Sequence, residues 1–570
     1  MKCTVRFPAE DVSVTVDDRM TLLEAQIAAG FRVNAPCGGT GTCGKCAVEC
    51  RRPGESAYTR VRACQTRVCE NMEIRRLDGG ASISVMLNGE HAKRAEHNPM
   101  VRAVHLHVSP CPRGKSISDW TRLCAALDDA IGRHEWKLSI AVSRGLGKLL
   151  HKTRGEIWAV VGEDGSILEA SAERPVVYMA AFDVGTTTIA GYLIDADTGN
   201  TVASRGAGNP QAQYGADVIS RANHALEHGV EELSVCVREA IDALIQRMCD
   251  EAGVQADRVC AVMLAGNTAM HHLLLGISPD SLVRAPYNPV VNQRLSVSAV
   301  SCGLKIHPAA QLYALPVIGG FVGADTVACM ISGDWQHRER TALMIDIGTN
   351  GELVLGNSSR RMACSTAAGP ALEGAKISCG MRAEDGAIDR VWLENEKLCW
   401  HVIGRCAAKG ICGSGLVDLI AMLLENGQLN GSGRLSDGDR YEIGDTGVWL
   451  TQKDVREVQL AKAAICAGIH LMCDSMGIDL NDISQVDIAG AFGNYVNPDN
   501  ACAIGMIPPI LRDRISQVGN AAGTGAQLAL LDADLWKNSE KLAGDTEFLE
   551  LATVPEFQDE FVEQLSFDGE

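Results

Sequence analysis

The 570-residue sequence predicts a multidomain protein of the α+β and α/β classes. Two observations support this prediction. Near the N-terminus, two short alternating strands and a helix lead into a glycine-rich loop with closely spaced cysteines. Further along, an apolar strand that delivers an aspartate to a Gly-Thr turn occurs twice. The segments between these patterns alternate between period-two strands and capped helices, which favours several mixed sheets packed against helices.

The first part of the chain predicts a small mixed-sheet unit. Residues 2–6 and 11–16 alternate polar and apolar side chains as a hairpin does, and residues 21–30 have a capping threonine and a glycine stop, which predict a helix. Further strands are expected at 47–51 and 72–77. The cysteine loop lies between the helix and these strands.

The cysteine loop predicts an iron-sulfur centre. Three of its cysteines fall within ten residues, and a fourth follows after a gap. Plant-type [2Fe-2S] proteins use the spacing C-x4-C-x2-C with a distant fourth cysteine, and here the first gap has five residues instead of four. Glycines let the backbone pass close to the sulfurs and point amides at a negatively charged cluster. The predicted ligands are Cys37, Cys43, Cys46 and Cys64.

Other readings of these cysteines stay open. A structural zinc site would favour four cysteines in paired short spacings. Cys43 and Cys46 alone would suit a thiol redox motif. Cys50 and Cys69 lie close enough to confuse the assignment, and we interpret them as accessory thiols.

The overall composition excludes several classes of protein. The formal net charge of -19 argues against nucleic acid or an anionic membrane as the main partner. The N-terminus leads into an alternating strand rather than a signal peptide, and no apolar run reaches the roughly 18 to 20 residues that a membrane span needs. The 22 cysteines are scattered through a long chain, which favours a reducing, anaerobic cytoplasm over a disulfide framework.

Residues 81–99 are polar and predict a linker, and residues 100–174 predict a small α/β middle domain without a chemical motif. We expect this domain to act as a spacer or docking unit. Its predicted elements are a strand at 101–108, a helix at 118–133, and strands at 138–142 and 157–161.

The repeated strand-aspartate-turn pattern, in residues 175–570, predicts a phosphate clamp in each of two duplicated lobes. Turn amides and threonine hydroxyls donate to phosphate oxygens, and Asp183 and Asp346 are candidates for holding Mg²⁺ through water. One D-x-G-T segment is a weak signal, whereas two copies are much stronger. The candidate phosphate-binding residues are Gly185, Thr186, Thr187, Thr188, Gly348, Thr349, Asn350, Gly351 and Glu352.

Four further glycine-rich segments follow in an order that suits a nucleotide site. Residues 319–326 could begin a helix between the lobes, and residues 519–526 form a small-residue helix start that suits a hinge. Residues 487–494 form a strand entering a glycine turn, which leaves room for an adenine ring. Residues 410–415 are either a nucleotide loop or a plain loop. The candidates from the last two segments are Gly413, Ser414, Gly490, Ala491, Phe492 and Gly493.

This series of segments resembles the phosphate, connecting and adenosine motifs of the superfamily of acetate and sugar kinases, heat-shock chaperones and actin. With a ferredoxin in front, the whole chain resembles the reductive activators of corrinoid-dependent enzymes. The resemblance implies a β-grasp [2Fe-2S] ferredoxin at 1–80 and a two-lobed actin-like ATPase with ribonuclease-H-like lobes at 175–570. Segments typical of the family are found at 209–221, 265–270, 368–375 and 410–415.

The resemblance also implies a function. It implies ATP-dependent, one-electron reduction of an inactive Co(II) corrinoid protein of a methyltransferase system to Co(I), with a [2Fe-2S] cluster, ATP and Mg²⁺ as cofactors. An upstream low-potential electron donor and a homodimer are expected. We expect His271 and His272 to be packed or capping residues rather than cobalt ligands, and Cys364, Cys379, Cys406 and Cys412 to be core or loop thiols.

Other functions remain alternatives at this point. The chain would also suit a ferredoxin-fused small-molecule kinase or ATP-dependent hydrolase, or an ATP-coupled electron donor to another low-potential enzyme. A redox-sensing or actin-like assembly protein would bind nucleotide without electron transfer. Activators of radical dehydratases use the same superfamily, but a separate ferredoxin domain fits them poorly.

Overall fold

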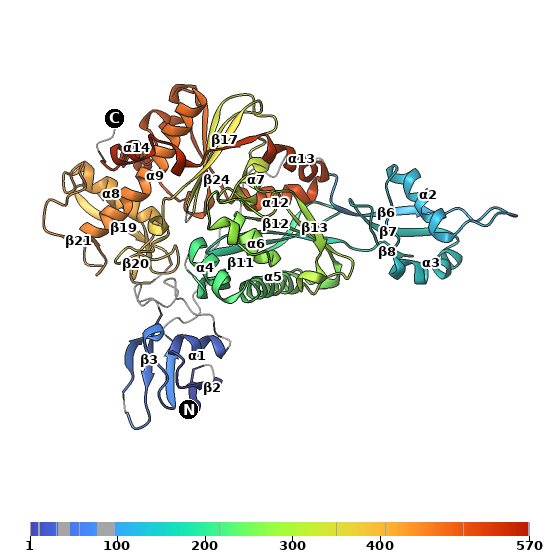
Figure 1. Ribbon diagram of the computed structural model, residues 1–570, viewed down its shortest axis with the longest axis horizontal. Helices are drawn as coiled ribbons and strands as arrows, with labels where there is room; N and C mark the ends of the chain where they lie inside the picture. Colours follow the sequence, from blue (N-terminus) through green and yellow to red (C-terminus); the bar gives the residue numbers. More distant parts are fainter. Residues whose placement is uncertain are drawn as a thin grey trace.

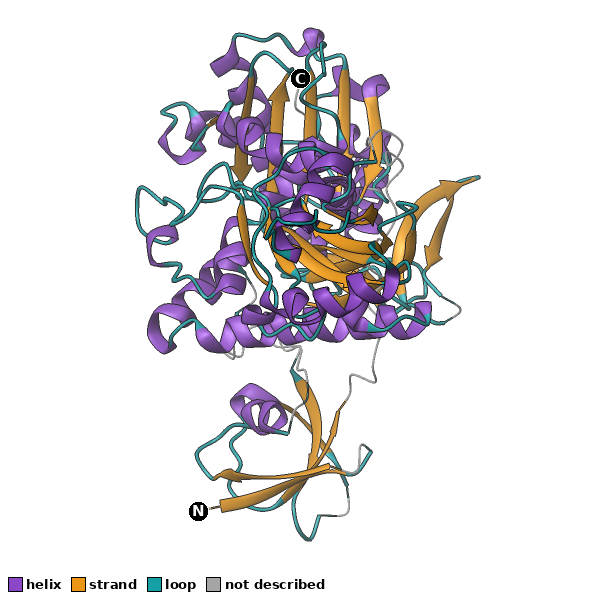
Figure 2. Cartoon of the chain, turned by 90° about the vertical axis from the view of Figure 1, so that its right-hand side faces the viewer, coloured by secondary structure: helices purple, strands orange, loops and turns teal. Residues whose placement is uncertain are grey.

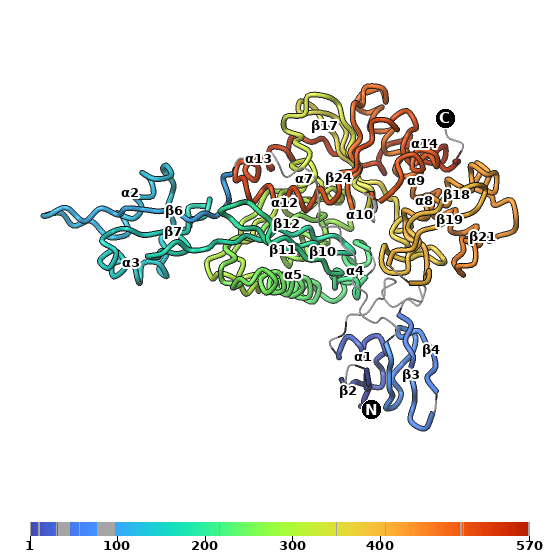
Figure 3. The backbone as a smooth tube through the Cα atoms, turned by 180° about the vertical axis from the view of Figure 1, so that it is seen from behind, coloured from blue at the N-terminus to red at the C-terminus, as the bar shows by residue number. Residues whose placement is uncertain are grey.

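The computed structural model describes residues 2–9, 12–29, 31, 46–55, 57–76, 97–215, 217–348, 350–404, 406–493 and 495–567. Figures 1 and 3 show the N-terminal unit and the unit that contains β6, β7 and β8 projecting from a larger two-lobed body. Cys37, Cys43, Thr349 and most of the predicted linker lie outside the described residues. The predicted domain boundaries stay predictions.

The N-terminal unit is a five-stranded mixed sheet in the order β2-β1-β5-β3-β4, in which β1 is parallel to β5. Thr21 and Glu24 form a capping box at the start of α1, so the predicted helix is confirmed. The sheet and the helix enclose a separate small core that includes Val5, Phe7 and Ile74. The elements are β1 Lys2–Phe7, β2 Val12–Asp17, α1 Leu22–Ala28, β3 Ala47–Arg51, β4 Thr59–Arg62 and β5 Met72–Arg76.

The second unit is a three-stranded antiparallel sheet in the order β6-β7-β8, packed against two helices. Its elements are β6 Val101–His107, α2 Asp119–Ile131, α3 Ile140–Thr153, β7 Glu156–Gly162 and β8 Ile167–Ser171.

One prediction in this unit is wrong. The segment 138–142 was expected to be a strand, but residues from Ile140 onward form helix α3. The side chain of Ser139 caps this helix, and Val142, Leu146 and Leu150 recur every four residues on its buried face. A window of five residues was too short to distinguish this spacing from strand alternation.

The two-lobed body contains two six-stranded sheets with matching topology. Each begins with three antiparallel strands, and two later strands then add in parallel beside the first strand of the three. The strand orders are β11-β10-β9-β12-β14-β13 and β24-β23-β15-β16-β17-β25. Apart from the outermost strands β13 and β25, the sheets repeat one order, which confirms the predicted duplication. Figure 2 shows both sheets with helices packed around them.

The first lobe contains the earlier phosphate-type turn between β9 and β10. Its strands are β9 Tyr178–Val184, β10 Thr188–Asp195, β11 Thr201–Gly208, β12 Val259–Gly266, β13 Leu295–Ser298 and β14 Gln311–Ala314. Its helices are α4 Val218–His228, α5 Glu231–Ala252, α6 Thr268–Leu275 and α7 Ala324–Ser332.

The second lobe contains the later turn between β15 and β16. The strands of its main sheet are β15 Ala342–Ile347, β16 Gly351–Gly356, β17 Arg361–Thr366, β23 Gln485–Ala489, β24 Ile515–Gly519 and β25 Thr546–Phe548. Smaller sheets contain β18 Ala387–Glu394, β19 Lys397–Val402 and β20 Gly410–Ile411, and β21 Arg440–Glu442 and β22 Trp449–Thr451. The helices are α8 Gly413–Glu425, α9 Gln452–Met476, α10 Gly490–Gly493, α11 Pro498–Ala503, α13 Ala533–Gly544 and α14 Phe557–Glu563. Helix α12 Ala521–Leu531 follows β24 in the chain but packs against β9, β10 and β12 of the first lobe.

Helices α7 and α12 pack against each other where the two lobes meet. They share one buried core with strands of both main sheets. At Gly525 of α12, a Cβ atom would lie 1.8 Å from the carbonyl oxygen of Ala328 in α7, so only glycine permits this approach. The small residues expected from residues 519–526 therefore serve close packing of the two helices.

Replacing Gly525 should separate α7 from α12. Because the added atoms would clash with backbone, we expect Gly525→Val to lower the free energy of unfolding of the two-lobed body by about 1–3 kcal/mol or more. Differential scanning calorimetry would measure this loss. Gly544→Ala is the control, since a Cβ there meets nothing within 4 Å. Equal unfolding temperatures for the two variants would contradict this account of the packing.

Candidate functional site

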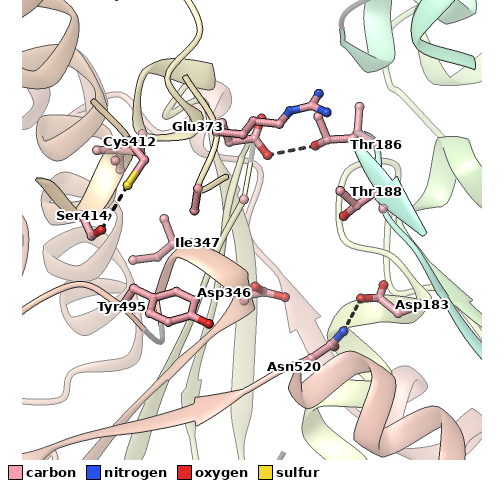
Figure 4. A pocket seen from close by; sticks show the side chains of 18 of the residues that line it. Asp183, Thr186, Thr188, Asp346, Ile347, Glu373, Cys412, Ser414, Tyr495 and Asn520 are labelled. Atoms are coloured by element: carbon pink, nitrogen blue, oxygen red, sulfur yellow. Dashed lines mark hydrogen bonds between the residues drawn. The ribbon is translucent and has the colours of Figure 1, made fainter. Parts of the chain in front are cut away.

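A cavity of about 480 Å³ lies between the two lobes and is lined by both repeated turns. Asp183 stands near the end of β9 and Asp346 near the end of β15, so equivalent strands deliver them to the same space. Figure 4 shows the two carboxylates on facing sides of the cavity. The structure thus brings together the two aspartates that the sequence singled out.

The two turns have the same local geometry. In the first, the amide of Gly185 donates to the carbonyl of Thr188 at 2.9 Å. In the second, the amide of Gly348 donates to the carbonyl of Asn350, also at 2.9 Å. Each turn connects two antiparallel neighbouring strands, as the sequence predicted.

Four carboxylates converge at this end of the cavity. Asp325 of α7 and Glu352 of β16 join Asp183 and Asp346 in its lining. Desolvation by the surrounding protein is the main cause that raises the pKa of each group. The pKa values are raised to about 7 for Asp183 and Asp325 and to about 6 for Asp346, and the pKa of Glu352 is raised well above its usual range. Repulsion from Asp346 raises the pKa of the other three further.

Neighbouring groups fix the positions of these carboxylates. The side-chain amide of Asn520 donates to Asp183 at 3.0 Å while its oxygen caps α12 (Figure 4). The thiol of Cys329 lies 3.6 Å from Asp346. Gly490 has a φ of +88°, and a Cβ there would lie 2.6 Å from Asp346, so this position needs glycine for both reasons.

The carboxylates suit a hydrated divalent cation. Within the described part of the chain, no three histidine, cysteine or acidic side chains are placed to ligate one metal ion directly. Mg²⁺ usually retains several waters and is bound through one or two carboxylates together with phosphate oxygens. The donor set therefore fits an ion whose contacts to most of these carboxylates pass through water.

The cavity extends from the acidic end towards helix α8. Thr187 donates to Glu373 at 2.9 Å, which joins a turn of the first lobe to the 3-10 segment Pro370–Glu373 of the second. Further along, Ser414 at the start of α8 donates to the carbonyl of Asp389, whose carboxylate lies 2.6 Å from the ring of His401. Apolar and aromatic side chains complete the lining and include Ile347, Leu372, Met381, Ile403 and Tyr495.

Most of the predicted site residues that the structure describes line this cavity. They are Asp183, Gly185, Thr186, Thr187, Thr188, Asp346, Gly348, Asn350, Glu352, Gly413, Ser414 and Gly490. Gly351 and Gly493 are outside that lining. Gly351 begins β16, and Gly493 packs against Ile488. Ala491 and Phe492 belong to the short helix α10, and the placement of their side chains is not described.

Several lining residues were not assigned from the sequence. Asp325 and Asn520 fall inside the two connecting segments, each at the start of a helix, and a search for polar residues there would have found them. Asn267 caps α6 and donates to Thr186 at 2.9 Å. Asp389 of β18 and His401 of β19 lie on paired strands, and no sequence pattern marks either of them as a site residue.

The N-terminal unit brings together the two predicted ligand cysteines that are described. Cys46 and Cys64 are both buried, and their sulfur atoms lie 3.2 Å apart without a disulfide. Cys46 comes just before β3, and Cys64 lies in the 3-10 turn Ala63–Gln65. Two adjacent thiols facing each other fit ligation of one iron centre.

The two histidines that follow Asn267 are packed. His272 is fully buried, accepts from the amide of Val290 at 2.9 Å and pairs with the carbonyl of Thr268 at 2.8 Å. His271 is buried beside it, and burial lowers the pKa of His271 to about 4. His272 thus contacts two backbone groups and the ring of His271, which agrees with the structural role expected for this pair.

Comparisons with known proteins place the chain in a family. Residues 7–69 match the family described as 2Fe-2S iron-sulfur cluster binding domain, residues 178–338 match the RACo middle region, and residues 340–570 match the C-terminal domain of RACo, the ASKHA domain. The chain is 32% identical over 594 residues to "Corrinoid activation enzyme RamQ" of Eubacterium limosum, an alignment that covers 99% of each protein. It belongs to the family of corrinoid reductive activators.

Two further relatives agree with this membership. The chain is 28% identical over 429 residues to "[Co(II) methylated amine-specific corrinoid protein] reductase" of Methanosarcina barkeri, covering 69% of this chain and 77% of the relative. The solved structure titled "Reductive activator for corrinoid,iron-sulfur protein" superposes with a TM-score of 0.77 and 30% identity, covering 99% of this chain and 98% of that one. The multidomain fold inferred from the family resemblance is thereby confirmed.

None of the described helices is both long and apolar enough to cross a bilayer.

The raised pKa values predict that Mg²⁺ stabilises this corrinoid reductive activator more at high pH than at low pH. Below about pH 6, most of the four carboxylates bind a proton and attract a cation weakly. As the pH rises towards about 7, Asp183, Asp325 and Asp346 ionise and repel one another, so the stability of the metal-free protein falls. A divalent cation should then restore it.

Calorimetric unfolding with and without MgCl₂ at about pH 6 and about pH 8 would measure this effect. We expect the increase in unfolding temperature on adding Mg²⁺ to be larger at the higher pH, and Asp183→Asn to reduce the difference. An equal increase at both pH values would contradict a cation site built on these carboxylates.

Proposed function

We propose that this chain is an ATP-dependent reductive activase, which transfers one electron to an inactive Co(II) corrinoid protein and so produces Co(I). The observation that carries this proposal is the presence, in one chain, of paired ligand cysteines in a ferredoxin-type unit and of facing aspartate turns between two duplicated lobes. The names of its relatives support the corrinoid acceptor.

The electron-transfer group is proposed to be a [2Fe-2S] cluster held by Cys37, Cys43, Cys46 and Cys64. The adjacent buried sulfurs of Cys46 and Cys64 suit this group. When bound, it would accept one electron from an upstream low-potential donor and release one electron to Co(II). The cysteines would hold and shield it, and the side-chain amide of Gln65 lies 3.8 Å from the sulfur of Cys64.

The nucleotide is proposed to be Mg-ATP in the cavity between the lobes. Asp183, Asp346 and the nearby carboxylates would orient the hydrated Mg²⁺, while the turns at Gly185 and Gly348 would direct amides and hydroxyls at the phosphates. The apolar end near Tyr495 suits a flat base. Hydrolysis consumes one water and yields ADP and phosphate.

The energies involved make ATP coupling reasonable. For one electron, a deficit of a few hundred millivolts corresponds to about 5–7 kcal/mol. Shifting a two-state equilibrium from 1:99 to 99:1 takes about 5.5 kcal/mol of differential binding. Because α7 and α12 pack at the junction of the lobes, closure around Mg-ATP would change the surface that the two lobes present together. We propose that this change controls docking of the corrinoid protein.

We propose a homodimer in an anaerobic cytoplasm, with the corrinoid protein and a low-potential donor as partners and no role for nucleic acid or membrane. The proposed domains are the ferredoxin at 1–80, a linker at 81–99, a middle domain at 100–174 and the ATPase at 175–570.

The decisive experiment is anaerobic reduction of a Co(II) corrinoid protein from a methyltransferase system. The purified chain receives a chemical reductant, and the visible spectrum is followed with and without Mg-ATP. Growth of a Co(I) band only with Mg-ATP supports the activase. ATP-dependent phosphorylation of an added small molecule without any Co(I), across several corrinoid partners, would overturn it in favour of a kinase.

Removing the charge of either facing aspartate should stop ATP from driving electron transfer while leaving the iron-sulfur centre intact. Asp183→Asn and Asp346→Asn each lose a Mg²⁺-orienting carboxylate while keeping side-chain size, so we expect ATP-dependent Co(I) formation to fall by about 100-fold or more. The visible spectrum of the iron-sulfur centre should stay unchanged. Full activity in either variant would refute the assignment of these residues.

Removing a ligand cysteine should also prevent Co(I) formation, but through loss of the cluster rather than of the nucleotide site. Cys64→Ser should lose the visible absorption of the cluster and all Co(I) formation, while ATP binding in the distant cavity is retained. The matched control is Cys69→Ser, because Cys69 is an exposed thiol of the same unit. Co(I) formation by Cys64→Ser at the wild-type rate would show that the electron takes another route.

A further inference from the structure

The family-typical segment 209–221 lies directly behind the first phosphate-type turn. The side chain of Asn209 donates to the carbonyl of Gly185 at 2.8 Å, and its backbone amide donates to the carbonyl of Thr187 at 2.9 Å. Asn209 also caps the 3-10 segment Pro210–Gln213. The segment is therefore attached to the turn at two backbone carbonyls.

Arg221 of α4 adds a third attachment from the same side. Its guanidinium donates to the carbonyl of Thr186 at 2.6 Å and to the carbonyl of Gly215 at 2.9 Å. Gly215 is in close contact with α4, since a Cβ there would lie 2.8 Å from the amide of Arg221. Arg221 has no exposed surface, whereas Thr186 lines the cavity. The arginine thus holds the turn from behind without reaching the cavity itself.

Among the described residues, the groups within hydrogen-bond distance of this guanidinium are neutral, while the carboxylates of Asp217 and Glu373 act on it at longer range. Besides the two carbonyls, the neutral groups are the side-chain oxygen of Gln211 at 3.5 Å and the sulfur of Met270 at 3.4 Å. Asp217, one turn away, uses its carboxylate to cap α4 at the amide of Ser220. Burial lowers the pKa of Arg221 to about 10, so the side chain is still charged at neutral pH.

A buried cation with only neutral contacts is costly unless an anion compensates it. The turn that Arg221 holds is the one proposed to receive phosphate. A positive charge below the turn would attract the phosphates through a poorly polarisable region, where screening by salt is weak. The charge of Arg221 would therefore raise the affinity for a nucleotide in proportion to the negative charge that the nucleotide carries.

We propose that Arg221 is a positioning residue for the nucleotide, which fixes the phosphate turn by its hydrogen bonds and attracts the phosphates by its buried charge. The inference rests on the proposed ATP-dependent function and deepens it. Asn209 shares the first of these roles but not the second.

The test compares nucleotides that differ only in phosphate number. Dissociation constants of ATP, ADP and AMP, each with Mg²⁺, are measured by calorimetric titration of the full-length chain and of Arg221→Met. We expect the constant to rise by about tenfold or more for ATP, by less for ADP and by less than about twofold for AMP. A merely structural role would weaken all three equally.

Two variants separate charge from packing. Arg221→Lys keeps the charge but loses the fork of donors, so its loss of ATP affinity should be smaller than that of Arg221→Met. Gln211→Glu places a carboxylate beside the intact guanidinium, and should weaken ATP more than AMP although Arg221 remains. This second variant keeps the test decisive if Arg221→Met fails to fold.

The matched control is Arg361→Met. Arg361 is also buried and bonded to backbone carbonyls, but it lies in the second lobe against α13 and outside the cavity lining. Arg361→Met should lower the free energy of unfolding by a comparable amount. Any change that it makes in nucleotide affinity should not depend on the number of phosphates.

The outcomes distinguish this inference from the proposed function. Wild-type protein that binds no ATP would overturn the proposed function itself. Wild-type protein that binds ATP, together with folded Arg221→Met or Gln211→Glu that binds ATP within about twofold of wild type, would overturn only the role of Arg221.

Discussion

The structure depends above all on the convergence of four carboxylates where the two lobes meet. Burial in the cavity raises the pKa values of Asp183, Asp325, Asp346 and Glu352, and repulsion from Asp346 raises those of the other three further. Two of them come from the equivalent strands β9 and β15, the third from α7 and the fourth from β16. The position of one lobe relative to the other therefore sets how close these charges lie. A cation that neutralises them stabilises one particular arrangement of the lobes.

Small and amide side chains make this arrangement possible. Gly490 leaves room for the Asp346 carboxylate, and Gly525 lets α12 touch α7. Asn520 caps α12 with its oxygen and donates to Asp183 with its nitrogen, so the helix at the junction and the first turn are joined through one side chain. A shift of α12 relative to β9 would break one of these two contacts. The proposed cation site and the packing of the lobes thus depend on the same few residues.

The sequence predicted the parts of this protein that have local signals. The capping box of α1, the alternating strands and the two Asp-x-Gly-Thr turns each fall within a short window, and the structure forms them. His401 takes its place in the cavity lining from tertiary packing between segments far apart in the chain, so its role could not be predicted from any window. Asp325 and Arg221 lie inside segments that the sequence singled out, but the packing of distant segments sets which groups they face. The missed helix α3 has another cause, because the segment 138–142 that suited a strand includes only its first three residues, and only the later leucines show the helical spacing.

The separation of the two cofactor sites restricts how ATP can act on the electron. Cys46 and Cys64 belong to a unit with its own sheet and core, whereas the carboxylates belong to the two-lobed body. None of the described cavity-lining residues comes from the ferredoxin-type unit. The described residues of the two sites therefore belong to separate units. This arrangement supports the proposal that the nucleotide acts by changing which surfaces meet, and since closure of the lobes would move many side chains together, a few kcal/mol of differential binding is enough to select one docked state.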